Sequence, residues 1–256
     1  MRVSLYVSAD TWLHRLDPMT KLLMAATGVT LTFILTRTES AAVLLAIFLA
    51  ALGTGRVLRQ AASVFAGVGI VAATFLIVQG LVHPTNATPL IALGPVVLYT
   101  EGLLIGLRLA LRLYNILSAT LILVLATNPA DLTEALVRRG APARLGYVIM
   151  SVLQIIPTMV AQSAAITDAQ RSRGMETEGS LWTRAKAFLP LMGPLVTSSL
   201  IATEERALAL EVRGFGSTVR PTFLRAETRP PHAVPVRILC VLTLALGATG
   251  RWVLGW

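Results

Sequence analysis

The chain has 256 residues, of which 55% are hydrophobic and only 14% are charged, and its formal net charge is +9. Soluble domains usually carry about a quarter charged residues, and several apolar runs approach the length of a bilayer span, so the composition excludes an ordinary soluble enzyme. Excess arginine on a membrane protein usually marks cytoplasmic segments, so we expect the lipid bilayer, and no nucleic acid, as a partner.

Five apolar runs are predicted to cross the membrane: Leu22–Leu35, Ala41–Leu52, Val64–Val82, Gly102–Ala126 and Ile238–Leu254. Basic residues precede the first run and lie between the second and third, whereas the loop His83–Glu101 has none. Because cytoplasmic loops carry the lysines and arginines, this pattern predicts a cytoplasmic N-terminus. Four crossings then return the chain to the cytoplasm near Asn128.

The stretch Arg138–Arg229 contains twelve of the 22 basic residues, yet it also holds the apolar segment Leu145–Val160. We interpret that segment as part of one long helix, roughly Pro142–Arg173, which lies along the membrane without crossing it. At a rise of 1.5 Å per residue such a helix is on the order of 45 Å long. The alternative is that Leu145–Val160 forms part of a transmembrane hairpin.

Glycines 174 and 179 are predicted to break the chain before a short helix at Leu181–Leu189 and a second long helix, Pro194–Arg213, that stops at Gly214. A proline-rich linker, Arg220–Pro235, leads into the last span. No strand-period pattern is apparent, so the sequence predicts an all-α membrane protein with about five transmembrane helices plus long cytoplasmic helices. We divide it into residues 1–128 with four spans, 129–219 with the cytoplasmic helices, and 220–256 with the linker and last span.

A short repeat ends both long helices. Each ending reads Ala-x-x-x-Arg-Gly, formed by Ala169, Arg173 and Gly174 in the first helix and by Ala209, Arg213 and Gly214 in the second. A small residue four positions before an arginine lies on the same helix face and leaves space beside the guanidinium. Simple helix capping explains one such ending, but two endings in the most basic segment favour a functional role. On the second helix, Ser199, Ala202 and Arg206 continue the same stripe, which predicts a helix-crossing face of small side chains and arginines.

The sequence resembles the transmembrane T component of energy-coupling factor (ECF) transporters, a family of ABC-type importers that includes cobalt- and biotin-transporter permease subunits. The resemblance covers residues 5–216. It begins with Ser8-x-x-x-x-Leu13-His14-x-Leu16-Asp17-Pro18-x-x-Lys21-Leu22-Leu23, continues through Thr127-Asn128-Pro129-x-Asp131-Leu132-x-x-Ala135-Leu136 and Ile156-Pro157, and closes on the two Arg-Gly endings. Ser172 and Val212 stand where the family often has alanine.

The resemblance implies a scaffold subunit of the bacterial cytoplasmic membrane for a vitamin or transition-metal importer. In that family the helices with these endings are coupling helices that insert into two ABC-type ATPase subunits, and a separate membrane S component captures the substrate. It therefore implies ATPase coupling for the six residues of the endings, with ATP and magnesium held on the partner subunits and no cofactor on this chain.

Other kinds of site have little support in the sequence. The only two lysines, Lys21 and Lys186, lie outside any glycine-rich phosphate loop, and the three histidines lack metal-ligand spacing, so neither catalytic residues nor a metal site are predicted. An autonomous secondary carrier and a multipass membrane enzyme remain the alternative functions. Arg108 and Arg112, which lie within the fourth apolar run, are interpreted as interfacial charges or partners of Glu101, or else as a contact for the substrate-capture protein.

Overall fold

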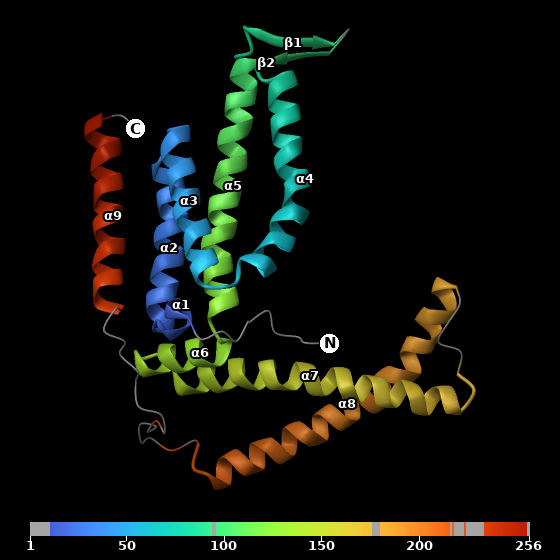
Figure 1. Cartoon of the computed structure of the whole chain (residues 1–256). Helices are drawn as coiled ribbons and strands as arrows, with labels where there is room; N and C mark the ends of the chain where they lie inside the picture. The colour runs from blue at the N-terminus through green and yellow to red at the C-terminus, as the bar shows by residue number, and fades with distance from the viewer. Residues whose placement is uncertain are drawn as a thin grey trace. The chain divides into compact units, whose positions relative to one another are not determined.

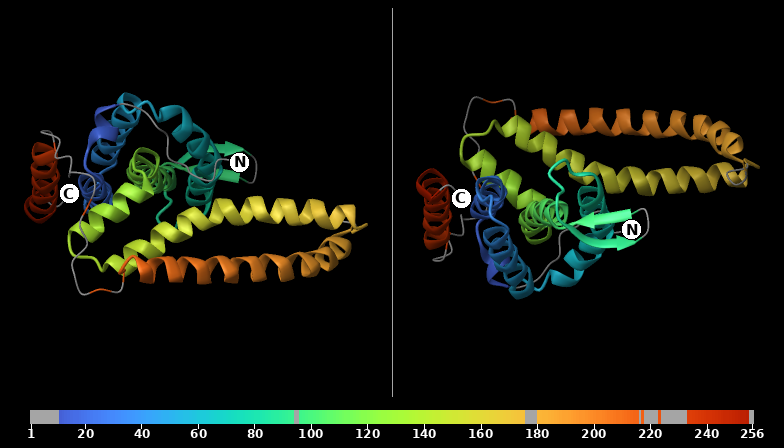
Figure 2. Two further views of the ribbon diagram at one scale, coloured as in Figure 1. Left: turned by 90° about the horizontal axis from the view of Figure 1, so that it is seen from below. Right: turned by 90° about the horizontal axis from the view of Figure 1, so that it is seen from above.

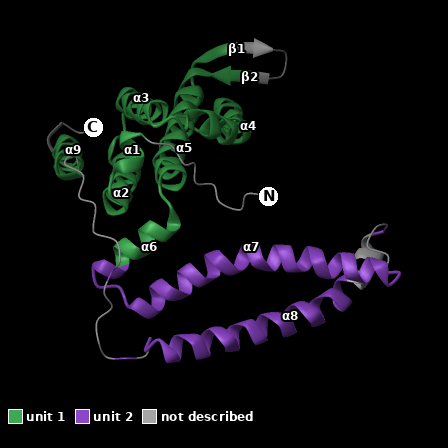
Figure 3. Ribbon diagram, turned by 60° about the horizontal axis from the view of Figure 1, so that its bottom comes forward, with its two compact units in different colours: residues 1–136, 227–256 green, residues 137–226 purple. Residues whose placement is uncertain are grey.

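The computed structural model describes residues 11–93, 96–175, 180–215, 217, 223 and 233–254. They group into two compact units, residues 1–136 with 227–256 (unit 1) and residues 137–226 (unit 2), shown in green and purple in Figure 3. Within the described residues, four helices have the length and apolar composition of a membrane span, and two shorter apolar helices accompany them. The predicted all-α membrane fold is confirmed.

Unit 1 contains the predicted spans as helices that extend a few residues beyond the apolar runs (Figure 1). Its elements, in chain order, are α1 (Trp12–Arg15), α2 (Pro18–Ile34), α3 (Thr38–Thr54), α4 (Leu58–Val82), β1 (Pro89–Leu93), β2 (Val96–Tyr99), α5 (Thr100–Ala126), α6 (Pro129–Arg138) at the boundary with unit 2, and α9 (Ala233–Leu254). Proline at the first position of α2 is favoured there, because that position needs no backbone donor and its φ suits a helix.

The core of unit 1 forms where α2, α3 and α5 meet. Leu13, Leu52 and Ile122 are among its most buried side chains, and Leu13 brings the short α1 into the same cluster. Asn115 of α5 is fully buried and donates from Nδ2 to the carbonyl oxygen of Ala41 on α3 at 2.9 Å. An inter-helix hydrogen bond of this kind fixes the register of two helices that apolar contacts alone would leave free to slide.

Helices α4 and α5 approach most closely at two glycines spaced four residues apart on α5. A Cβ atom at Gly102 would overlap the carbonyl oxygen of Gln79, and one at Gly106 would lie 2.8 Å from the Cα atom of Leu76. The sequence Gly102-Leu-Leu-Ile-Gly106 is therefore a small-residue contact of the type that allows helix backbones to meet in membranes. This motif was not among the features predicted from the sequence.

The outer loop contains a two-stranded antiparallel hairpin, so the expectation that no strand occurs is wrong. Strands β1 and β2 pair Ile91 with Leu98 and Leu93 with Val96, with an irregularity between Pro89 and Ile91. Glu101 at the start of α5 accepts hydrogen bonds from the Thr88 hydroxyl and from the backbone of residues 87 and 88, which secures the base of the hairpin. The hairpin is apolar along both strands, so it lacks the alternation that identifies a strand in sequence.

Unit 2 is an antiparallel pair of long helices, α7 (Ala143–Ser172) and α8 (Leu181–Val212), which lie side by side in both views of Figure 2. Helix α7 agrees with the predicted Pro142–Arg173 helix. It also meets the length and composition criteria for a span, so its hydropathy leaves both interpretations of Leu145–Val160 open.

The prediction of two separate helices after Gly174 is wrong, because residues 181–212 form one helix that contains Pro190 and Pro194. Each proline removes one backbone donor and favours a bend, and Figure 1 shows α8 bent in its first part. Gly179 and most of the linker Arg220–Pro235 lie outside the described residues, and α9 already begins at Ala233.

Candidate coupling site

Both Arg-Gly endings form the same backbone cap. At the end of α7, the Gly174 N–H donates to the carbonyl of Arg171 at 2.9 Å and the Met175 N–H donates to that of Gln170 at 3.1 Å. At the end of α8, the Gly214 N–H donates to Glu211 at 2.9 Å and the Phe215 N–H donates to Leu210 at 3.0 Å. These paired bonds define a Schellman motif, which satisfies carbonyl groups that a helix end leaves without partners.

The two glycines are required by the backbone conformation of this cap. Gly174 has φ +88° and Gly214 has φ +71°, in the left-handed region that other residues enter at a cost of about 1–2 kcal/mol. In each cap the arginine is the residue directly before the glycine, and both Arg173 and Arg213 are exposed. The cap thus ends the helix abruptly and leaves a guanidinium at its tip.

The helical pairing places the two caps at opposite ends of unit 2. The ring of Tyr147 near the start of α7 lies 5.1 Å from that of Phe215, which directly follows Gly214. From Tyr147, α7 continues for 25 residues to Ser172, which corresponds to about 38 Å at 1.5 Å per residue. The two arginines are therefore separated by roughly the diameter of a small domain, and each can contact a different protein.

The remaining predicted site residues occupy different environments. Ala169 and Ala209 are exposed, one turn before their arginines, whereas Ser199, Ala202 and Arg206 are half-buried along α8. Ser199 satisfies its hydroxyl within the helix by donating to the carbonyl of Val196 at 2.8 Å. The roles assigned to these residues in coupling and helix crossing stay predictions.

The exposed arginine of α8 is flanked by apolar side chains. Val212, which stands directly before Arg213, is 89% exposed, and Phe215, two residues after that arginine, is 39% exposed. A tip that combines an exposed arginine with uncovered apolar groups has the composition of a protein-interface core. The end of α7 differs, because alanines precede Arg173 on its exposed face.

The two motifs nearer the N-terminus meet in unit 1. Lys21 is 2% exposed and donates from Nζ to the carbonyl of Ala126 at 2.6 Å and to that of His14 at 3.1 Å. The first motif therefore binds the end of α5 directly before the Thr127-Asn128-Pro129 motif, 105 residues further along the chain. Asn128 in turn accepts a hydrogen bond from the Ala130 N–H at 3.0 Å, which starts α6.

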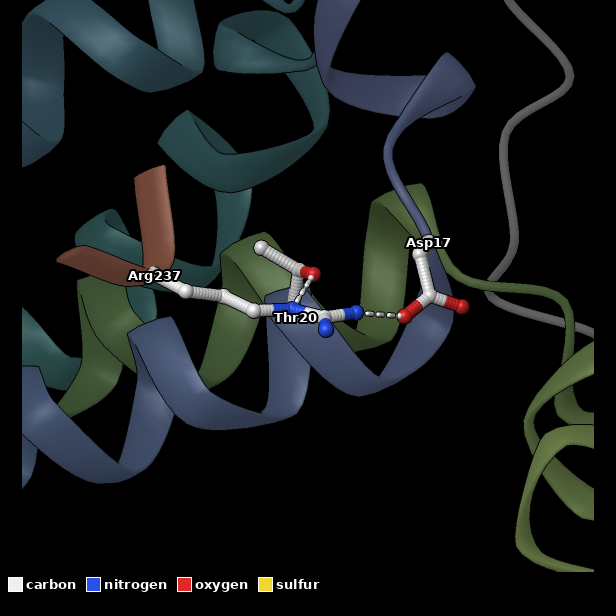
Figure 4. Close-up of polar contacts among 3 residues, drawn as sticks. All are labelled: Asp17, Thr20 and Arg237. Atoms are coloured by element: carbon white, nitrogen blue, oxygen red, sulfur yellow. Dashed lines mark hydrogen bonds and ion pairs between the residues drawn. The ribbon is translucent and has the colours of Figure 1, made fainter. Parts of the chain in front are cut away.

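Asp17 joins the first apolar helix to the last one (Figure 4). Arg237 of α9 contacts the Asp17 carboxylate at 2.6 Å and donates from Nε to the hydroxyl of Thr20 at 2.8 Å. Both acceptors belong to the start of α2, and Thr20 is fully buried. Arg237 was not among the residues predicted from the sequence, although a lone arginine near the start of an apolar run is the signal that could have identified it.

Arg108 and Arg112 face the α2–α3 connection. Arg108 donates from Nε to the Thr38 hydroxyl at 3.0 Å, and the Arg112 guanidinium lies 4.9 Å from the ring centroid of Phe33. The expected pairing with Glu101 is wrong, because Glu101 instead accepts hydrogen bonds from the chain that leads into β1. Within the described residues, no three His, Cys, Asp or Glu side chains gather as a metal site requires.

The chain is similar to known membrane transport proteins. The family model CbiQ, described as cobalt transport protein, matches residues 9–222. A protein of Bacillus selenitireducens is 32% identical over 222 residues, covering 82% of each chain, and one of Brevibacillus brevis is 32% identical over 237 residues, covering 87% of this chain and 88% of its own. A Staphylococcus aureus protein is 39% identical over 135 residues, about half of each chain.

All three relatives carry the name energy-coupling factor transporter transmembrane protein EcfT. The CbiQ match spans most of the chain, from the N-terminal motif that contains Asp17 and Lys21 through both capped helices. The chain belongs to the CbiQ family and is a multi-pass transmembrane component of an energy-coupling factor transporter.

Proposed function

We propose that this chain is the scaffold subunit of an ECF-type importer for a vitamin or a transition-metal ion. It transmits ATP-driven motion from two ABC-type ATPase subunits to a separate substrate-binding membrane protein, the S component. The observation that carries the proposal is the pair of identical arginine-tipped caps at opposite ends of one helical pair. Two equivalent contacts about 38 Å apart suit two copies, or two homologues, of one kind of partner.

Arg173 and Arg213 are the residues that anchor the ATPases in this proposal. A guanidinium at a helix tip forms charge-assisted hydrogen bonds with carboxylates or carbonyls of a groove. Ala169 and Ala209 keep the adjacent helix face narrow, and the caps stop each helix so that only its tip enters the groove. Movement of an ATPase groove then pulls on the helix whose tip it holds, and each of these helices has 30 or more residues. Ser199, Ala202 and Arg206 provide the face on which α8 crosses its neighbour.

The chain supplies no ATP site in this scheme, so ATP and magnesium belong to the partner ATPases. The protein resides in the bacterial cytoplasmic membrane, with its N-terminus and the stretch Arg138–Arg229 on the cytoplasmic side, because that stretch holds most of the basic residues. A secondary carrier or membrane enzyme is the alternative, and it predicts activity from the chain alone. Purification in mild detergent distinguishes the scaffold from these alternatives, because only a scaffold should co-purify with ATPase chains.

The test replaces each tip arginine. Arg173→Ala and Arg213→Ala should each reduce uptake about tenfold, since a well-placed charge-assisted hydrogen bond contributes about 1.5–3 kcal/mol. The double variant should lose ATPase association or transport. Arg→Lys should also impair uptake, because an ammonium group does not reproduce the planar guanidinium fork. Arg59→Ala is the matched control, an exposed arginine on α4 of unit 1.

Insertion is measured in the same strains with a cysteine at exposed Ser217 in a Cys240→Ser background. An impermeant thiol reagent should label it only after lysis. A double alanine variant that assembles with its ATPases and transports at the wild-type rate would reduce the two endings to ordinary helix caps, and labelling in intact cells would reverse the orientation.

A further inference from the structure

Unit 1 contains an arginine-lined pocket at the α2–α3 connection. Its volume is about 240 Å³, and Arg37, Arg108 and Arg112 contribute to its walls together with Thr36. Arg108 and Arg112 come from one face of α5, and Arg37 lies directly before α3. Three guanidinium groups around one small pocket form a site for an anion, because each supplies planar, directional donors suited to phosphate.

The positive charges of Arg108 and Arg112 are not neutralised by the neighbouring helices. Within the part of the chain that the structure describes, Arg108 is bonded to the Thr38 hydroxyl and Arg112 lies over the Phe33 ring, and neither has a carboxylate partner. Charged groups within a membrane bundle are expensive and usually pair or mark a site. Polar and aromatic contacts orient these two arginines while their charge stays available to a ligand.

An apolar groove continues directly from the arginine pocket. It has a volume of about 890 Å³ between α2, α3 and α9, and it shares Leu35 and Arg37 with the pocket. Val43, Ile47 and Leu246 on its walls are 61%, 59% and 69% exposed. Glu39 also lines the groove, and this single carboxylate is outnumbered by Arg108 and Arg112 of the adjoining pocket.

The order of these features matches the order of groups in a phospholipid. Arg37 lies between the end of α2 and the start of α3, and Arg108 and Arg112 of α5 contact the residues beside that connection. The groove follows α3 for two turns away from the connection. A lipid likewise places its phosphate at the end of the spans and its acyl chains along them. The groove is also continuous with the exposed apolar surface of α3 and α9, which acyl chains cover in a bilayer.

We propose that the arginine pocket and the adjoining groove bind one anionic phospholipid, with its phosphate at Arg37, Arg108 and Arg112 and an acyl chain between α3 and α9. The bound lipid fills the space between α3 and α9, which pack against different neighbours, α3 against α5 and α9 against α2. It thereby acts as a structural ligand of the membrane unit, independent of the capped helices.

The experiment measures lipid retention by the full-length protein in detergent, using native mass spectrometry with phosphatidylglycerol and phosphatidylcholine of identical chains. Phosphatidylglycerol should bind at least about fivefold more tightly, and each of Arg108→Ala and Arg112→Ala should weaken it about fivefold, since one arginine contributes on the order of 1 kcal/mol toward an anionic lipid. Arg59→Ala is the charge-matched control outside the pocket and should have no effect.

In the second arm of the experiment, a larger side chain fills the groove without changing its charge. Ile47→Trp should weaken binding of both lipids by about fivefold or more, because the indole ring displaces part of the acyl chain from the groove. Ile70→Trp, at a 75% exposed position on α4 that does not line the groove, is its control. Helicity and thermal unfolding of each variant verify that the fold is kept.

Three results would overturn the proposal. Equal retention of the two lipids would remove the anionic selectivity. The arginine variants could weaken the binding of glycerol 3-phosphate, which has no acyl chain, as much as they weaken lipid binding. If Ile47→Trp then left lipid binding unchanged, the pocket would be a phosphate site that does not bind a lipid. Unchanged lipid binding in all variants, with impaired assembly with the S component, would assign the groove to that protein partner.

Discussion

The two units of this chain use similar apolar helices in opposite ways. Unit 1 encloses a core whose members come from five helices, and polar side chains such as Lys21 and Asn115 reach across to the backbone of another helix. Among the described residues of unit 2, only Gly146 and Leu195 are buried. Its defined hydrogen-bond geometry lies in the caps at the ends of α7 and α8. The difference indicates that unit 1 specifies its own packing, whereas unit 2 keeps its apolar faces for the membrane or for other proteins.

Glycine shows the contrast most directly. In unit 1, Gly102 and Gly106 are needed because another helix occupies the space of a side chain. In unit 2, Gly174 and Gly214 have open space around them and are needed for their positive φ. The same residue type thus serves inter-helix packing in one unit and local backbone geometry in the other.

The largest effect is expected from removing the buried amine of unit 1. Lys21→Met should lower the free energy of unfolding by about 3 kcal/mol or more, because the carbonyls of Ala126 and His14 lose a charged donor in a buried place. Thermal unfolding in detergent measures the effect, with the exposed Arg59→Met as control. Equal unfolding temperatures for the two variants would mean that the hydrogen bonds of Lys21 do not stabilise unit 1.

A smaller loss is expected when the helix crossing is overfilled. Gly106→Ala should destabilise unit 1 by about 1–3 kcal/mol, since the added methyl group meets the backbone of α4. Gly67→Ala on α4 and Gly193→Ala on α8, where no atom lies within 4 Å of the added carbon, should instead stabilise by up to about 1 kcal/mol. Similar destabilisation at all three positions would remove the distinction between packed and open glycines.

The smallest effect should come from the cap of α8. Gly214→Ala costs about 1–2 kcal/mol locally, because alanine disfavours a φ of +71°. Hydrogen exchange at the Phe215 amide should accelerate about tenfold while the unfolding temperature of unit 1 stays unchanged, and Gly214→Asn should be milder. Unchanged exchange at Phe215 would show that the cap does not depend on glycine, and a shift in unit 1 would show that the two units are coupled in stability.

The sequence alone was sufficient for features set by local chemistry. Hydropathy located the five longer helices of unit 1 and the long α7, because each contains an extended apolar run. The arginine-glycine pairs located both long-helix ends, because a left-handed residue after the last turn is a local requirement that glycine meets. Local patterns failed at Pro190 and Pro194, where two missing donors bend α8 but do not end it.

Tertiary structure decided which distant residues meet. Lys21 lies 105 residues from Ala126, and Asp17 lies 220 residues from Arg237, so no periodicity in the sequence connects them. The hairpin β1–β2 was missed because its strands are apolar on both faces, and the arginine pocket was missed because its members come from α5 and the α2–α3 connection. A local pattern records what each helix is made of, whereas contacts between helices depend on crossing geometry, which is fixed only when all of them pack together.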